Sequence, residues 1–361
     1  MNAPRPHDVE GLSDSERGML RKSVRDLLAR HWPVEGAVER ADDAQAIAGV
    51  WRALAGQGLA TLGSDPAEGG LQEIVLVFEE LGRASCPAPM LGAVAANLAF
   101  ANQRSNVARD LLEQLHRGEA MVAAALGGFD GDPAAGQVEI RDGALSGKAA
   151  FVEGAQPATH MLVFCQSPAG AAIVASGSAG LQVQATPGLA VPAFAELTFD
   201  DTPAAITEVS PEALADIAMV ARLACAGRAL GAAQRAFDLS VEHAKLRKQF
   251  GQLIGQFQAV QHKLADNLIA LDGARLTIQS AAQSRDHGDP EWRVFAAAAL
   301  SFAGPALRAV SIQTHRALGA IGYAEEHEAP RHFRRVHADL ARFGGAPRAR
   351  GEIADYLLGP A

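Results

Sequence analysis

The sequence is short of cysteine, aromatic residues and positive charge. Aromatic side chains make up 5% of the 361 residues, and 32 Lys and Arg stand against 41 Asp and Glu, for a net charge of −9. Because no stretch concentrates positive charge, a nucleic-acid partner has no electrostatic basis. The three cysteines, Cys86, Cys165 and Cys225, share no CxxC spacing, which gives no metal framework. We predict that they are small core residues in a reducing cytoplasm.

The sequence also lacks long apolar runs and an apolar leader. No run approaches the roughly 18 apolar residues that span a bilayer, and the opening MNAPRPHDVEGLSDSE has no hydrophobic core of a signal peptide. We therefore expect a cytoplasmic protein with no membrane partner. With 48% hydrophobic and 20% charged residues, the composition is that of an ordinary globular protein. A chain of 361 residues is long enough for two or three domains.

The hydrophobic pattern changes twice along the chain and predicts a multi-domain protein of helices and strands. Residues 1–117 have helical periodicity, residues 118–205 consist of short apolar runs between Gly, Pro and Ser clusters, and residues 206–361 return to helical periodicity. We expect an N-terminal α-helical domain, a central β-barrel or sandwich, and a C-terminal four-helix bundle.

Local signals place elements within these domains. Ser13 and Glu16 form a capping box before the first helix, and Asp142-Gly143 is a hairpin turn signal. The segment GGAPRARG near the end is more typical of a helix start than of a phosphate-binding loop. Helical segments are predicted near residues 47–59, 71–81, 91–100, 211–246, 254–286 and 291–318, with shorter pieces after 329.

One segment of the predicted bundle has a specific sequence signature. RKQFGQLIGQFQAVQHKLAD, at residues 247–266, resembles the motif that opens the second bundle helix of the acyl-CoA dehydrogenase flavoproteins. Residues 51–70, 79–89 and 318–328 carry weaker resemblances to the same family. The resemblance implies the acyl-CoA dehydrogenase fold, FAD as cofactor, and α,β-dehydrogenation of an acyl-CoA thioester. It also implies an oligomer, with an electron-transfer flavoprotein as a further partner.

The resemblance also implies which residues contact FAD. In the family this loop reaches the FAD of the neighbouring subunit, where an arginine can pair with the diphosphate and phenylalanines can pack against ring edges. The alternative is a purely structural role, in which the arginine is a solvated loop residue and the two phenylalanines only anchor the helix. A separate Gln-x-x-Gly-Gly segment of the family contacts the adenosine end of FAD, and it reads Arg316-Ala317-Leu318-Gly319-Ala320 here. The residues implied in cofactor binding are Arg247, Gln249, Phe250, Phe257, Gln258, Arg316 and Gly319.

The catalytic glutamate of the family has no counterpart in this sequence. That carboxylate removes the proton alpha to the thioester while hydride leaves the beta carbon for the flavin. By resemblance its common position corresponds to Phe343 and its less common position to Ala221, and neither side chain accepts a proton. Glu325, Glu326 and Glu328 lie in a motif whose glutamate is structural in the family, so we do not expect any of them to be the base.

The segments that contact the flavin ring in the family also differ here. A T-E-x-x-x-G-S-D-like segment is replaced by ALGGFDGDPAAG at residues 125–136, and an F-I-T segment by Phe151-Val152-Glu153. An acid therefore stands where the family has a hydroxyl donor. The loop that serves the neighbour's cofactor is preserved best, and the pocket for the chain's own flavin is preserved worst.

Two functional hypotheses follow from this pattern. The chain is either an autonomous acyl-CoA dehydrogenase with an unidentified base, or a base-less subunit that completes the active site of an unlike partner. A flavin monooxygenase or oxidase on the same fold is a weaker third alternative. The acyl chain or ring system of the substrate has no sequence motif, because pocket shape selects it.

Three histidines near the C-terminus are the remaining candidates for a site. His327, His332 and His337 recur every five residues, whereas metal ligands on a helix are spaced three or four residues apart. We interpret them as surface or interface histidines and expect no metal. The segment GFDGDPAAG has too few carboxylates for a calcium loop.

Overall fold

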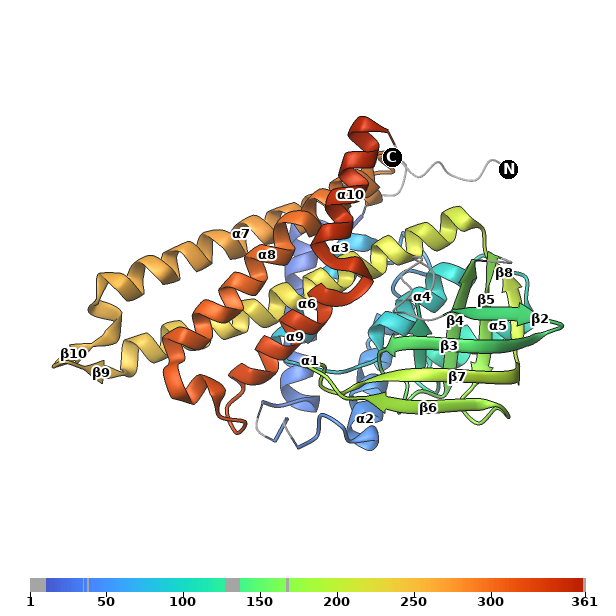
Figure 1. Ribbon diagram of the computed structural model, residues 1–361, viewed down its shortest axis with the longest axis horizontal. Coiled ribbons are helices and arrows are strands. Elements are labelled where there is room, and N and C mark those ends of the chain that lie inside the picture. The colour runs from blue at the N-terminus through green and yellow to red at the C-terminus, as the bar shows by residue number, and fades with distance from the viewer. Residues whose placement is uncertain (1–10, 35, 38, 127–136, 167–168, 360–361) are drawn as a thin grey trace.

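The protein consists of a layer of two β-sheets at one end and a bundle of long helices that extends from it (Figure 1). The structure is a computed structural model. It describes residues 11–34, 36–37, 39–126, 137–166 and 169–359. The shorter N-terminal helices lie between the sheets and the bundle.

Among the described residues, five helices make up the N-terminal part, which is the α-helical region predicted from the sequence. The predicted capping box is present, since Ser13 accepts from the backbone N–H of Glu16 and the Glu16 side chain accepts from that of Ser13. The fifth helix, at residues 106–116, was not predicted as a separate element from the sequence. The helices are α1 (Asp14–His31), α2 (Ala44–Gly56), α3 (Leu71–Arg83), α4 (Met90–Phe100) and α5 (Asn106–His116), with a 3-10 turn η2 (Leu59–Thr61) after α2.

Two four-stranded sheets follow, in the strand orders β1-β4-β5-β8 and β2-β3-β7-β6. The strands are β1 (Val122–Ala125), β2 (Val138–Arg141), β3 (Ala144–Val152), β4 (His160–Gln166), β5 (Ala169–Ala175), β6 (Leu181–Thr186), β7 (Phe194–Pro203) and β8 (Ala205–Glu208). The predicted hairpin at Asp142-Gly143 joins β2 to β3. Leu145, Val163 and Phe199 belong to the apolar cluster that fills the space between the sheets.

The C-terminal part is the predicted bundle. The elements are α6 (Pro211–Leu246), the hairpin β9 (Lys248–Gln249) and β10 (Gln252–Leu253), η5 (Ile254–Gln256), α7 (Gln258–Asp286), α8 (Trp292–Leu318), η6 (Gly319–Tyr323), α9 (Ala329–Ala341), η7 (Arg342–Gly344) and α10 (Gly345–Leu358). The segment GGAPRARG begins α10, as predicted. The domain boundaries at residues 117 and 205 stay predictions.

Helix α8 is the most apolar long helix among the described residues. Its extent with η6, Trp292–Tyr323, is long and apolar enough to cross a membrane by length and composition, although no uninterrupted apolar run marks it. Half of its most apolar window is buried inside the protein. That burial is typical of a core helix in a bundle, because a helix covered by other helices can be apolar on most of its faces.

Helices α3 and α6 cross in backbone contact. A Cβ atom placed on Gly82 would lie 1.8 Å from the carbonyl oxygen of Arg228, and one on Gly231 would lie 1.8 Å from the carbonyl oxygen of Glu79. No Cβ fits at these separations, so glycine is required at both positions. The two glycines bring α6 close enough to α3 for their charged residues to share one interior.

Replacing Gly231 by alanine tests this crossing. Because the added methyl group meets backbone rather than a movable side chain, Gly231→Ala should lower the free energy of unfolding by about 1–3 kcal/mol or more. Gly49 of α2 is the matched control, since a Cβ there meets nothing within 4 Å. Gly49→Ala should be neutral or stabilising by up to about 1 kcal/mol, because alanine is the better helix former. Thermal midpoints from calorimetry measure both; equal midpoints for the two variants would contradict the close crossing.

Candidate functional site

A buried cluster of charges joins the β-sheets to the bundle. Arg228 of α6, only 1% exposed, donates to the Glu153 carboxylate just after β3 at 2.6 and 2.8 Å. The same guanidinium donates to Asp339 of α9 at 2.7 and 2.9 Å. Such bidentate, charge-assisted pairs are the geometry that guanidinium groups form best with carboxylates.

Two further arginines complete the cluster. Arg342 donates to Glu153 at 2.7 Å, and Arg335 lies 3.4 Å from Glu153 and 3.7 Å from Asp339. Burial by itself would raise the pKa of the Glu153 carboxyl, but Arg228, Arg342 and Arg335 hold that pKa well below its usual range. Glu153 is therefore a firmly ionised acceptor. It is not free to donate a hydrogen bond to a ligand.

A pocket of about 290 Å³ lies beside this cluster, between the sheets and α9. Arg342 lies in its wall, with its guanidinium 5.0 Å from the ring centre of Phe194 and 4.8 Å from that of Phe343. The lining residues are mostly apolar. They are Ala124, Leu126, Ala150, Phe151, Val152, Thr186, Pro187, Gly188, Leu189, Ala190, Phe194, His337, Ala338, Ala341, Arg342 and Phe343.

Two aromatic residues in the pocket wall have left-handed backbone conformations. Phe151 has φ 57° and Phe343 has φ 54°. Aromatic residues rarely adopt positive φ, because the Cβ atom then approaches the neighbouring carbonyl, so the surrounding contacts must hold them there. For Phe343 those contacts include the stacked Arg342, which Glu153 anchors in turn.

Of the two sequence positions implied for the catalytic base, one lies at this pocket and the other does not. Phe343 lines it, whereas Ala221 is 2% exposed in the core of α6 and is not among the lining residues. Within the described part of the chain, no Asp or Glu side chain lines the pocket. Its one other titratable group besides Arg342, His337, bonds Ser311 at 3.1 Å, and burial lowers the pKa of that imidazole.

The expectation for the histidines was wrong at His332. This residue is 1% exposed, with Nδ1 3.0 Å from the Ser85 hydroxyl and Nε2 3.3 Å from the Glu328 carboxylate. Burial would raise the pKa of Glu328, but hydrogen bonds from His332 and Arg235 lower it to about 2. Glu328 is thus tied into the interior, away from the pocket, as its expected structural role requires. A spacing rule for metal ligands gives no information about such burial.

The residues implied in FAD contact by the signature lie in and beside the β9–β10 hairpin. The β9–β10 hairpin forms the far tip of the bundle in Figure 1, with Arg247 at its base. Phe250 is 94% exposed with φ 52°, and its ring lies 6.3 Å from that of Phe257 in an edge contact. Gln249 and Gln258 are exposed as well.

The end of α8 reaches the same end of the bundle. Leu318 packs in a small buried cluster with Leu239, near the end of α6, and Ala329. Arg316 and Gly319, on either side of Leu318, are exposed. Arg316 directly follows His315, whose ring lies 4.8 Å from that of Phe333, and Phe333 in turn stacks on His337 in the wall of the pocket.

Part of the expected flavin-ring region lies outside the described residues. Of the segment at 125–136, only Ala125 and Leu126 belong to the part that the structure describes. Phe151 and Val152 line the pocket with Leu126, so these separate sequence segments do meet there. Among the described residues, no cluster of three or more His, Cys, Asp or Glu side chains is arranged to hold a metal. All three cysteines are buried and free, as predicted.

Two family models match the chain and decide its membership. Residues 14–119 match "Acyl-CoA dehydrogenase, N-terminal domain" and residues 213–356 match "Acyl-CoA dehydrogenase, C-terminal domain". The chain belongs to the acyl-CoA dehydrogenase family. The family and fold expected from the sequence are therefore confirmed. FAD is the cofactor of this family and acyl-CoA dehydrogenation its reaction, so both apply to the chain at the level of the family.

Similar proteins cover nearly the whole chain. Acyl-CoA dehydrogenase IpdE2 of Mycobacterium tuberculosis is 31% identical over 332 residues, which is 89% of this chain and 91% of the relative. A solved structure titled Tcur3481-Tcur3483 steroid ACAD G363A variant is 27% identical with a TM-score of 0.83, covering 95% of this chain and 98% of that one. The ChsE4-ChsE5 complex of Mycobacterium tuberculosis has a TM-score of 0.83 at 22% identity, covering 97% and 99%.

Substituting Glu153 tests the buried cluster of this acyl-CoA dehydrogenase-family protein. Glu153→Gln leaves three arginines facing one carboxylate, and breaking a buried pair by removing one partner typically costs about 3–5 kcal/mol. Because the folded pKa of Glu153 is depressed, its stabilisation is present above the usual carboxyl pKa of about 4.3 and is lost as pH falls below it. Unfolding curves at pH 7 should therefore separate the variant from wild type, and curves in the acid range should converge.

The matched control is Glu139→Gln in the same part of the chain. Glu139 pairs with Arg141 at the surface, where the two side chains are 59% and 77% exposed. Exposed pairs contribute little, so this variant should unfold like wild type. If Glu153→Gln also unfolds like wild type at pH 7, the cluster does not hold the sheets to the bundle.

Proposed function

We propose that the chain is the base-less subunit of a heteromeric acyl-CoA dehydrogenase. The observation that carries the proposal is the pocket at Phe343, which has no carboxylate among its described lining residues. Removal of the proton alpha to a thioester needs a base within hydrogen-bond reach of that proton. In this role an unlike partner subunit supplies the glutamate, and the present chain supplies binding surface.

The chemistry of the pocket argues against a flavin ring of its own. A flavin ring has a polar edge of carbonyl oxygens and ring nitrogens, for which a protein supplies N–H or O–H donors. The side chains of this pocket are mostly apolar, and Arg342 is already engaged by Glu153. Glu153 is ionised and can only accept hydrogen bonds. We therefore derive no catalytic step at this pocket.

The hairpin at the other end of the bundle has the donors that a partner's cofactor would need. FAD, when bound by the partner, supplies the hydride-accepting ring and a diphosphate anion. Arg247 would pair with that diphosphate, Gln249 and Gln258 would hydrogen-bond, and Phe250 and Phe257 would pack against the cofactor. The high exposure of Phe250 supports this role, because a lone subunit leaves the ring in water. Arg316 and Gly319 would contribute at the adenosine end.

The names of the similar proteins suggest the assembly and the substrate. Tcur3481-Tcur3483 and ChsE4-ChsE5 each pair two unlike chains, and the first is described as a steroid ACAD. We accordingly propose a steroid-derived or other ring-containing acyl-CoA as substrate of the complex. An electron-transfer flavoprotein would reoxidise the partner's cofactor. We propose a cytoplasmic location for the complex.

An autonomous dehydrogenase is the second candidate. It is favoured by the 31% identity to a relative that is itself named an acyl-CoA dehydrogenase. An autonomous enzyme requires a catalytic base at a position other than Phe343 or Ala221, and a flavin site formed by residues other than the lining of the pocket at Phe343.

The chain purified alone separates the two candidates. As a base-less subunit it should be colourless, with no flavin absorption, and should not dehydrogenate straight-chain or steroid-derived acyl-CoA with an artificial electron acceptor. The same chain co-expressed with its partner should give a yellow, active complex. A yellow preparation of the chain alone that turns over any acyl-CoA would instead establish the autonomous enzyme.

Arg247 tests the role of the hairpin in the complex. Removing one partner of a largely desolvated ion pair typically costs about 2–5 kcal/mol, so Arg247→Ala should clearly reduce FAD per complex after gel filtration. Lys248→Ala is the matched control, because Lys248 is an exposed cation at the next position of the same hairpin. Both complexes should elute at wild-type size. An FAD ratio equal to wild type for Arg247→Ala would leave the alternative of a solvated loop arginine.

A further inference from the structure

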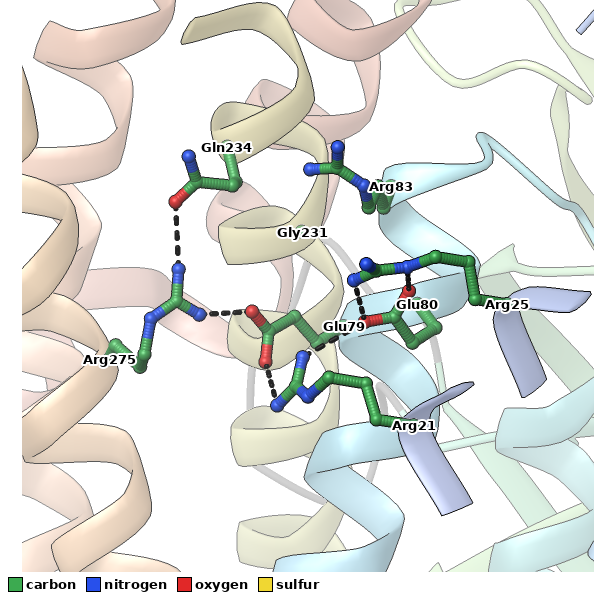
Figure 2. A pocket seen from close by; sticks show the side chains of 8 residues that line it. All are labelled: Arg21, Arg25, Glu79, Glu80, Arg83, Gly231, Gln234 and Arg275. Carbon is green, nitrogen blue, oxygen red and sulfur yellow. Dashed lines mark hydrogen bonds and ion pairs between the residues drawn. The ribbon is translucent and has the colours of Figure 1, made fainter. Parts of the chain in front are cut away.

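A second cavity lies among helices α1, α3, α6 and α7, apart from the pocket at Phe343. Its volume is about 360 Å³. Figure 2 shows charged side chains converging on it from three of these helices, with Gly231 of α6 behind them. The lining residues are Arg21, Arg25, Glu79, Glu80, Arg83, Gly231, Gln234 and Arg275.

Two glutamates of α3 form the floor of this cavity. The Glu80 side chain, 2% exposed, accepts from Arg21 and Arg25 at 2.9 Å. The Glu79 side chain, 7% exposed, accepts from Arg21 at 2.9 Å and pairs with Arg275 on the opposite side. Both acids are thus neutralised by arginines within the cavity itself.

The cavity keeps an excess of positive charge. Four arginines and two glutamates line it. Asp238 at the rim pairs with Arg83 at 2.7 Å, which leaves one positive charge in excess within this group. The neighbouring Arg235 pairs with Glu328 and Glu242, and these three side chains, which together carry one negative charge, do not line the cavity. An uncompensated guanidinium charge in a partly desolvated site attracts an anion.

Arg83 is the arginine best placed to bind a ligand. In Figure 2 its guanidinium points toward Gln234 and has no dashed line to any of the other residues drawn. In the described part of the chain its one charged partner is Asp238, which is 27% exposed. A guanidinium carries five N–H donors, so most of those of Arg83 remain available. Gln234 faces it from α6, with its amide oxygen accepting from Arg275 at 2.8 Å.

From this geometry we infer that the cavity is a binding site for a small multivalent oxyanion, such as a pyrophosphate or a polycarboxylate. The anion would lie between Arg83, Arg25 and Arg275, above the carboxylate floor. Guanidinium groups bind phosphate and carboxylate oxygens through paired N–H donors, which suits both kinds of oxyanion. The cavity lies within the size range of small-ligand sites. The inference is independent of the chain's role in a heteromer.

The site can be tested on the full chain by titration calorimetry with sodium pyrophosphate and with citrate, at constant ionic strength. Wild type should bind at least one of the two saturably, with one site per chain. Stronger pyrophosphate binding would identify a phosphate site, and stronger citrate binding a carboxylate site. Absence of saturable binding for both, at millimolar concentration, would overturn the inference.

Two substitutions at the rim should act in opposite directions. Arg83→Gln removes donors from the ligand and should weaken binding roughly tenfold to a hundredfold. Asp238→Asn removes the carboxylate that competes for Arg83, and should tighten binding. Asp238→Asn also keeps the test decisive if Arg83→Gln does not fold, because weaker or unchanged binding in the Asn variant would contradict the site.

Arg117→Gln is the matched control for charge. Arg117 caps α5, is 57% exposed, pairs with Glu119 at 3.2 Å, and does not line the cavity. The Arg117→Gln substitution changes the net charge by the same amount as Arg83→Gln, and it should leave the binding constant as in wild type. An equal loss of affinity in both variants would mean that the anion responds to the overall charge of the protein, and would overturn the inference.

Discussion

The buried guanidinium of Arg228 is the interaction on which the arrangement of the site depends. A charge that is 1% exposed is tolerated only with partners on all its donor sides, and Glu153 and Asp339 provide them. These two acids come from the β-sheets and from α9, so satisfying one cation fixes the sheets, α6 and α9 relative to one another. Arg342 shares Glu153 and stacks on Phe343. The conformation of the pocket wall therefore follows from the same electrostatic requirement.

Helix α6, which packs closely against α3, carries the buried cation and also lines the second charged cavity. Gly82 and Gly231 remove the side chains that would separate the two backbones. Arg228 then faces α9, while Gly231 and Gln234 face the arginines around Glu79 and Glu80 (Figure 2). A single helix thus connects two ionic groups with different surroundings. One is fully buried and saturated with partners, and the other is open and retains excess positive charge.

The fold of the family is retained here, and the described lining of the pocket at Phe343 contains no carboxylate. Fold depends on the apolar core, the helix crossings and the buried ion pairs, and none of these requires a carboxylate in that pocket. Function depends on a few side chains, so a retained fold does not by itself carry the reaction. The β9–β10 hairpin lies at the far tip of the bundle in Figure 1, away from the sheets that line the pocket.

The sequence by itself determined the local structure and the family. Helical and strand periodicity, the Ser13 capping box and the Asp142-Gly143 turn depend on neighbouring residues, so their physical cause is present in the sequence. The signature at Arg247 likewise depends on local spacing.

Tertiary structure alone decided which distant charges meet. Arg228 and Arg342 are 75 and 189 residues from Glu153, and no spacing rule connects them. The burial of His332, assigned to the surface from its spacing, also depends on helices packed from elsewhere in the chain. Desolvation and ion pairing act through space, so their outcome is fixed only when the sheets and the helices are packed together.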